Sequence, residues 1–170
     1  MNISDEFLAA VNRDYITDVA RLNAALRLDG EGMLVHHVPP HTFVGNIDKM
    51  REEDCILVIG INPFLWDDQR FERANIELPK RCLANFRATG DVNALSDWIG
   101  FQKRYFLSEE MNGTHFKKIA KLIGPRYFPR THKVDNWQET LFRHVVEVDI
   151  VPYYSKKARI NDEKLAKLYR

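Results

Sequence analysis

The chain has 170 residues, of which 45% are hydrophobic and 29% charged, and its formal net charge is +1. That length suffices for one domain, residues 1–170, with a sizeable core, and no apolar run reaches the about 18 residues of a membrane span. Two cysteines are too few for a disulfide framework or a zinc cluster. Because the acidic N-terminus lacks the regions of a signal peptide, we expect a cytoplasmic protein without a membrane partner.

The small net charge hides an asymmetry between the two parts of the chain. Residues 1–99 carry 10 Lys/Arg against 16 Asp/Glu, whereas residues 100–170 carry 15 against 8. Such a basic segment is typical of a surface that faces phosphates, and equally of solvated helix faces. The sequence leaves both interpretations open.

Apolar spacing predicts the elements in chain order. The first is a helix over residues 4–28, followed by an irregular segment at 39–46 and a strand at 56–60 that we expect to be buried on both faces. Residues 61–80 are expected to form a long polar and aromatic loop. The remaining expected elements are helices from 91 to about 106, over 112–123 and over 135–142, a strand at 144–151, and a helix over 161–170. This order predicts a layered α/β domain with a mainly parallel sheet, with one or two further strands within 32–47.

The most informative segment is the turn that follows the first strand, Gly60-Ile61-Asn62-Pro63-Phe64. Gly60 lets the backbone approach a ligand closely, and Pro63 stiffens the turn and disfavours helix at Asn62. Open α/β sheets bind ligands at the carboxyl ends of their strands. The pattern therefore predicts a ligand site at Asn62, with a simple strand-ending Asn-Pro turn as the alternative.

The second strand ends similarly, at Asp149-Ile150-Val151-Pro152. If the two strands are neighbours, Asn62 and Asp149 face the same crevice. Together, Gly60–Pro63 and Asp149–Pro152 resemble two segments of the uracil-DNA glycosylase superfamily, in its mismatch-specific and single-strand-selective branches. The segment Asn112-Gly113-Thr114-His115-Phe116 is similar to the start of a helix in that family.

The resemblance implies a three-layer αβα sandwich with a mainly parallel central sheet and an activity without a cofactor or metal. The implied reaction is hydrolysis of the N-glycosidic bond of uracil or a related base in DNA, single-stranded or damaged, after the base leaves the stack. Asn62 would hold the attacking water. Gly60, Ile61, Pro63, Phe64, Phe71 and Asp149 would line the base pocket. Phe64 would exclude thymine by its bulk, and Phe71 or Trp66 would stack on the base, with core packing as the alternative for these aromatic residues.

Two departures from the family pattern bear on this function. The base-reading Asn of the family corresponds to Asp149, and an ionised carboxylate only accepts hydrogen bonds, so it suits an exocyclic amine better than uracil O4. Asp149 also fits a buried acid with a raised pKa or a capping carboxylate. The second departure is that no histidine of this chain is followed by Pro-Ser, the family's second catalytic segment. The open explanations are a chain cut short, substitution by another residue, or lost catalysis.

Three hypotheses therefore remain: a glycosylase, a non-catalytic nucleic-acid-binding member of the same fold, and an enzyme acting on a nucleoside or nucleotide. For a nucleic-acid partner, Ser155, Lys156 and Lys157 are the candidate phosphate contacts. The histidines at 36, 37 and 41 are better explained as loop residues than as metal ligands, because prolines interrupt their spacing.

Overall fold

The computed structural model describes residues 14–51, 55–60, 63, 65, 69–109, 113–130 and 134–156. Within these residues a small mixed sheet has the strand order β1-β3-β2. The strands are β1 (Val44–Gly45), β2 (Ile56–Gly60) and β3 (Val145–Asp149). The central strand β3 runs parallel to β2 and antiparallel to β1.

Helices make up most of the described chain. The α-helices are α2 (Tyr15–Leu26), α3 (Gln69–Glu72), α4 (Leu78–Thr89), α5 (Ser96–Arg104), α6 (Gly113–Tyr127) and α7 (Trp137–His144). A π-helical stretch, Arg73–Glu77, joins α3 to α4. Short 3₁₀ turns cover Gly30–Gly32, Ile47–Arg51, Val92–Leu95, Tyr105–Leu107 and Val134–Asn136. No described helix has the length and apolar character needed to cross a membrane.

The expected three-layer αβα sandwich with a mainly parallel central sheet is wrong. The described chain is mostly helical, and its sheet has three strands with a single parallel pair. The strands expected within residues 32–47 reduce to the two-residue β1, which is antiparallel to its neighbour. The loop before β1 contains Pro39-Pro40, and proline cannot donate a ladder hydrogen bond, so this region cannot supply another central strand.

Strand β2 is also less buried than its unbroken apolar sequence predicts. Ile56 and Val58 pack against the core beside α6, but Leu57 and Ile59, on the opposite face, are 43% and 60% exposed. Because side chains alternate along a strand, one face of β2 is packed and the other is open to solvent. The expectation of a strand buried on both faces is therefore wrong for the described structure.

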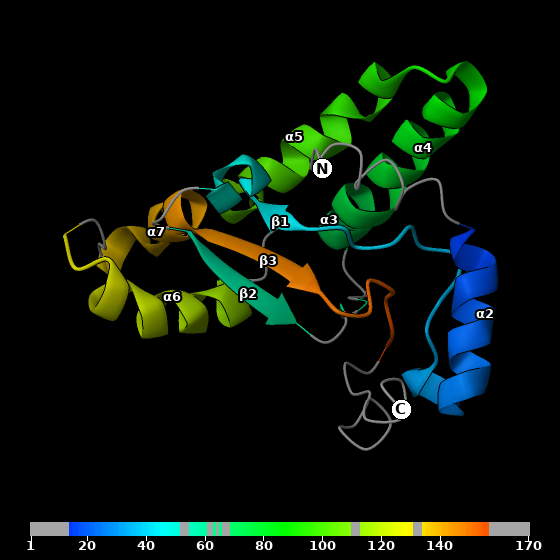
Figure 1. The fold of residues 1–170 in the computed structure, drawn as a ribbon, viewed down its shortest axis with the longest axis horizontal. Coiled ribbons are helices and arrows are strands. Elements are labelled where there is room, and N and C mark those ends of the chain that lie inside the picture. Colours follow the sequence, from blue (N-terminus) through cyan, green and yellow to red (C-terminus); the bar gives the residue numbers. More distant parts are fainter. Residues whose placement is uncertain are drawn as a thin grey trace.

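Figure 1 shows α6 on one side of the sheet, α4 and α5 on the other, and α2 beyond the carboxyl end of β3. The first core joins the sheet to α6 and α7, with Phe106, Phe116 and Leu141 among its members. The second core joins Val148 to Leu83 and Trp98 of α4 and α5. Helix α2 packs through Val19 and Leu26 onto the segment after β3.

Gly45 allows β1 to lie close to β3. Its φ is +98°, a conformation that favours glycine, and a Cβ there would lie 2.3 Å from the Val145 carbonyl oxygen. The register pairs Gly45 with Val146, so the missing side chain is what permits this short antiparallel contact.

Several expected helices are present, with changed ends. The helix expected from Asp91 onward is confirmed: Asp91 Oδ1 accepts a hydrogen bond from the Asn93 amide at 2.9 Å, and α5 follows. Helix α6 continues through Pro125, past the expected stop. Residues 69–80, expected as loop, are helical and lead into α4. The expected N-terminal helix is described only from Tyr15, and the expected last helix lies outside the described residues.

Candidate functional site

The carboxyl ends of β2 and β3 lie side by side, as the two sequence motifs required. Gly60 is in register with Asp149, and the Ile150 amide donates to the Gly60 carbonyl oxygen at 3.0 Å. The Ser155 amide donates to the Pro63 carbonyl oxygen at 3.3 Å. The structure thus brings Gly60 and Asp149 together and holds Pro63 beside Ser155.

Other predicted site residues lie outside the described part of the chain. These are Ile61, Asn62, Phe64 and Lys157. Trp66, the second candidate for base stacking, also lies outside it. Their assigned roles stay predictions.

Asp149 forms a nearly buried pair with a histidine that sequence reasoning assigned to a loop. His41 Nδ1 lies 2.9 Å from Asp149 Oδ2, and the two side chains are 10% and 7% exposed. The His41 backbone amide donates to the Pro152 carbonyl oxygen at 2.6 Å, which holds the residue against the segment after β3. When Nδ1 carries the proton donated to Asp149, Nε2 is the nitrogen available for other chemistry. The pair therefore fixes both the position and the tautomer of the imidazole.

Gly60 makes room for the Asp149 carboxylate. A Cβ built on Gly60 would lie 2.1 Å from Asp149 Oδ1 and 3.6 Å from Glu147 Oε1. Any side chain at position 60 would collide with the first of these atoms. The close approach expected at this glycine is thus made by a carboxylate of the protein itself.

Glu147 supplies a second acid–histidine contact on the same face of β3. His115 Nε2, in the first turn of α6, lies 3.6 Å from Glu147 Oε1, and the Glu147 side chain is nearly buried. The interaction with Glu147 raises the pKa of His115, with Asp149 adding to the effect and partial burial opposing it. His41, Asp149, Glu147 and His115 are called the strand-end cluster below.

Aromatic rings border the strand-end cluster. Tyr154 lies edge-on to His41, with ring centroids 6.0 Å apart, and edge-on to Phe71 at 5.7 Å. Burial raises the pKa of Tyr154 well above its ordinary value, and the charges near it act in the same direction. Phe71 is half-buried and packs against Tyr154. This position is compatible both with a residue that lines the site and with a residue that packs in the core.

The predicted phosphate contacts differ in accessibility. Ser155 is fully buried and bridges to Leu34, whereas Lys156 is exposed. Of these two, Lys156 is the residue that a phosphate can reach from solvent. Among the described residues, no three His, Cys, Asp or Glu side chains are grouped to hold a metal ion.

Sequence reasoning missed most of the strand-end cluster. One signal was present: in a strand, residues 147 and 149 share a face, so two acids at that spacing predict a paired acidic site. His41 and His115 gave no such signal, because they reach β3 from distant parts of the chain. Comparison with protein-family models, curated protein sequences and solved structures gives no match to this chain.

The chemistry available at the strand ends is acid–base and electrostatic. His41, Asp149 and Glu147 are largely removed from water, where charge interactions are stronger, whereas the ring of His115 is half exposed. An imidazole oriented by a carboxylate can take, donate or stabilise a proton near neutral pH. Such a group suits a reaction in which a leaving group departs with negative charge.

Proposed function

We propose that this chain is a DNA-base glycosylase-like protein that hydrolyses the N-glycosidic bond of uracil or a related base, with the attacking water held by Asn62. The observation that carries the proposal is the parallel register of Gly60 with Asp149. This register places side by side the two segments that resemble the uracil-DNA glycosylase superfamily. Both residues that flank the Ile61-Asn62 pair in sequence, Gly60 and Pro63, are hydrogen-bonded to the segment after β3.

Asn62 would act mainly by positioning the attacking water. Cleavage of an N-glycosidic bond passes through a state in which the sugar carries positive charge, so the attacking water needs correct placement more than a strong base. An amide can hold such a water through its carbonyl oxygen.

His41 is proposed to serve the departing base. Asp149 would accept a hydrogen bond from Nδ1–H, so a protonated His41 would direct its Nε2–H toward a base that leaves as an anion. This role is the one that the His-Pro-Ser segment has in the family, and no histidine of this chain has that sequence context. Asp149 would then act as a positioning residue for His41 rather than as the base reader.

The experiment is base release from a uracil-containing oligonucleotide by the full chain, read as free uracil and as alkali-labile abasic sites. Asn62→Ala is expected to lower the single-turnover rate by at least about a hundredfold, the usual cost of misplacing a reactant. His41→Asn is expected to lower it by roughly 10²-fold to 10⁴-fold, the range for a positioned acid–base group. Asn85→Ala, at an exposed position of α4, is the matched control and should keep the full rate.

The proposal fails if the unmodified chain releases no base from oligonucleotides carrying uracil or other altered bases. Binding of these oligonucleotides without release would favour the non-catalytic nucleic-acid-binding alternative. Release from free nucleosides but not from DNA would favour the nucleoside-processing alternative.

A further inference from the structure

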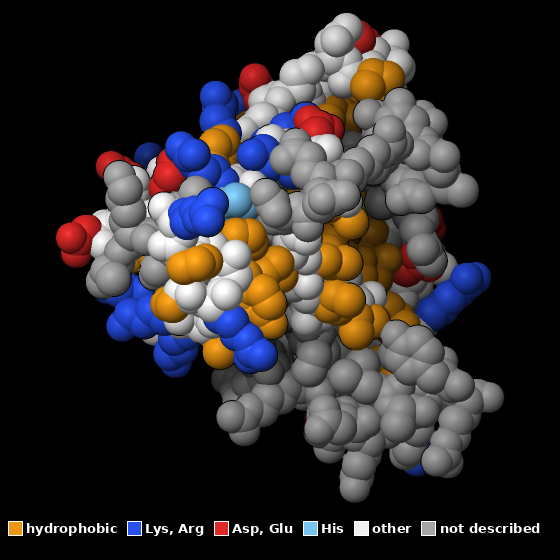
Figure 2. Space-filling view, turned by 60° about the vertical axis from the view of Figure 1, so that its left-hand side comes forward, with side chains coloured by type: hydrophobic (Ala, Val, Ile, Leu, Met, Phe, Trp, Pro, Cys, Tyr) orange, Lys and Arg blue, Asp and Glu red, His pale blue; other side chains and the backbone are white. Residues whose placement is uncertain are grey.

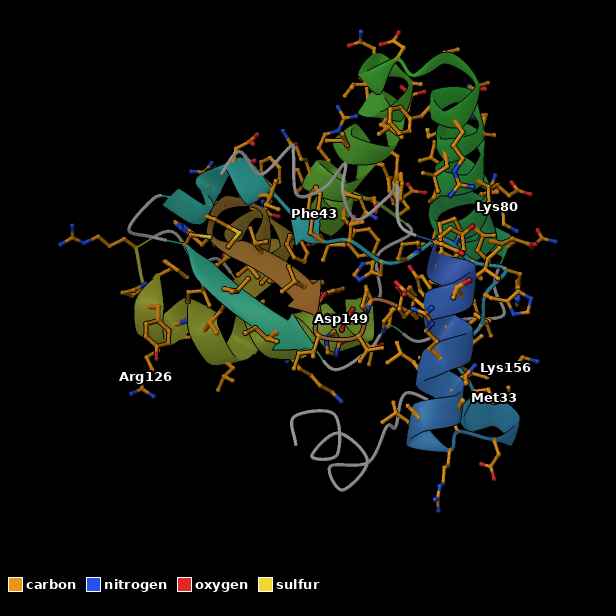
Figure 3. All side chains as sticks on the ribbon, turned by 45° about the vertical axis from the view of Figure 1, so that its right-hand side comes forward. Met33, Phe43, Lys80, Arg126, Asp149 and Lys156 are labelled. Atoms are coloured by element: carbon orange, nitrogen blue, oxygen red, sulfur yellow. The ribbon has the colours of Figure 1, made fainter. Side chains whose placement is uncertain are left out.

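A group of basic side chains lies beside the strand-end cluster and has no part in the chemistry proposed above. Its members, the basic patch, are His36, His37, Lys80 and Lys156. All four are exposed. They come from three separate parts of the chain: the loop before β1, the start of α4, and the segment after β3. Figure 3 shows Lys80 and Lys156 on the side of the molecule that carries α2, away from Arg126.

The backbone joins this patch to the strand-end cluster. Leu34 bridges to Ser155, and the Val35 amide donates to the Tyr154 carbonyl oxygen at 2.8 Å, so the histidines are held beside the segment that ends in Lys156. The rings of His36 and His37 are 6.2 Å apart and perpendicular. His41 lies on the same loop as the two histidines, and Asp149 is the last residue of β3, directly before the segment that ends in Lys156. A ligand held at the patch would therefore lie next to the proposed reaction site.

The charges around His37 are all of one sign. Partial burial lowers the pKa of His37, and Lys80, His36 and Lys156 lower it further. In the described part of the chain, neither Lys80 nor Lys156 forms an ion pair with a carboxylate. Like charges brought together without a counter-ion repel one another, and an anion placed among them relieves that repulsion.

We propose that the basic patch binds the phosphodiester backbone of a DNA strand and holds that strand beside the strand-end cluster. The choice of DNA rests on the proposed function, whereas the anionic class of the ligand rests on the patch itself. Phosphate contacts from lysine and histidine position a nucleic acid without reading its sequence. The patch would thus fix the strand, and the strand-end cluster would act on one nucleotide.

A second basic surface provides the comparison. Helix α6 carries Lys117, Lys118, Lys121 and Arg126, all exposed, and Arg126 lies over the Tyr127 ring. Figure 2, turned to bring the left of Figure 1 forward, shows lysines and arginines there among exposed hydrophobic side chains. These cations line a single helix, whereas the basic patch gathers three segments at the strand ends. Lys118 acts on His115 of the strand-end cluster, whereas Lys121 and Arg126 lie further along α6 and provide the comparison.

The test is binding of a short labelled oligothymidylate, which offers phosphates but no uracil, to the full chain at several salt concentrations. Lys80→Gln with Lys156→Gln should weaken binding by roughly 25-fold at 0.1 M salt, about fivefold per phosphate contact. The slope of log K against log salt should become shallower by about 1.4. Lys121→Gln with Arg126→Gln removes the same charge from α6. This pair should leave the affinity within about twofold of the unmodified chain and the salt slope unchanged.

Proton uptake supplies a second readout. A bound phosphate favours protonated His37, so binding of the oligothymidylate should tighten as the pH falls from about 7.5 to 5.5. His37→Asn should reduce this pH dependence. Both histidines are exposed, so these variants should fold, and circular dichroism of each variant checks this.

The inference is overturned if the α6 pair weakens binding and the Lys80/Lys156 pair does not. It is also overturned if inorganic phosphate at millimolar concentration displaces the oligothymidylate, since that identifies a site for a free anion. Its failure is distinguishable from failure of the proposed function. Weakened binding by the patch variants together with no uracil release from the unmodified chain leaves the patch standing and removes the enzyme. If the unmodified chain releases uracil and the patch variants bind as tightly as it does, the proposed function stands and the basic patch is not the DNA-binding surface.

Discussion

The imidazole of His41 and the carboxylate of Asp149 meet at 2.9 Å although 108 positions separate them in the sequence. The contact ties the loop before β1 to the end of the central strand, and both side chains are nearly buried. Figure 3 shows Asp149 at the centre of the molecule, between the helices. A polar pair in such surroundings stabilises the fold only while both members are present.

The first prediction is that the two residues are strongly coupled. Asp149→Ala should lower the free energy of unfolding by about 1–3 kcal/mol, because it leaves the polar His41 ring buried without its hydrogen-bond partner. Asp149→Asn keeps an oxygen that can accept from Nδ1 and should cost less. A double-mutant cycle with His41→Ala should give a coupling energy of about 1–3 kcal/mol by urea denaturation. Additive effects would mean that the contact does not form in solution.

The second prediction concerns the space that Gly60 leaves for Asp149. Gly60→Ala places a Cβ 2.1 Å from Asp149 Oδ1, so the carboxylate must move and the bond to His41 is lost. We expect a loss of about 2–4 kcal/mol in the free energy of unfolding. In an Asp149→Asn, His41→Ala background the loss should be smaller, because the pair is already absent.

Gly113→Ala is the matched control for this substitution. Gly113 starts α6 and has no atom within 4 Å of the Cβ position. Replacement by alanine there should be neutral or stabilising by up to about 1 kcal/mol. Equal effects at positions 60 and 113 would contradict the close approach of Asp149 to Gly60.

The strand ends could be predicted from the sequence because their signals are local. An apolar run ending in Gly60 and a second run ending at Pro152 mark two strands, and their similar endings indicated a shared site. The structure places them in parallel register. The polar partners could not be predicted in this way. His41 and His115 meet β3 through contacts between distant segments, which no periodicity records.

The helix over 69–89 was missed for a different reason. Charged and polar residues fill much of it, and Pro79 is typical of a break. Its buried residues nevertheless follow a helical spacing: Ala74, Asn75, Pro79, Cys82 and Leu83. Pro79 is tolerated because it is the second residue of α4, directly after the π-helical stretch.

The third prediction is a pH dependence from His115. Its pKa is raised above the ordinary value of 6.5, chiefly by the contact with Glu147, so the folded state favours the protonated ring. The stabilisation is therefore fully present below about pH 6.5 and is lost as the pH rises through the raised pKa. NMR titration of the His115 ring should give a midpoint above 6.5, and Glu147→Gln should bring it down.

The unfolding free energy should follow the same pattern. The stability difference between the unmodified chain and Glu147→Gln should shrink as the pH rises from about 6 to 8. Since His115 is half exposed, the effect should be small and reduced by salt. A difference that grows with pH would contradict the ion pair.

The fourth prediction concerns the open face of β2. Ile59 is 60% exposed, so Ile59→Thr, which keeps a β-branched side chain in the strand, should change the free energy of unfolding by less than about 0.5 kcal/mol. Val146→Thr on the neighbouring strand puts a hydroxyl into a fully buried position and should cost about 1–3 kcal/mol. Urea denaturation of both variants measures the contrast. If Ile59→Thr costs as much as Val146→Thr, this face of β2 is covered in solution, as the unbroken apolar sequence of the strand predicts.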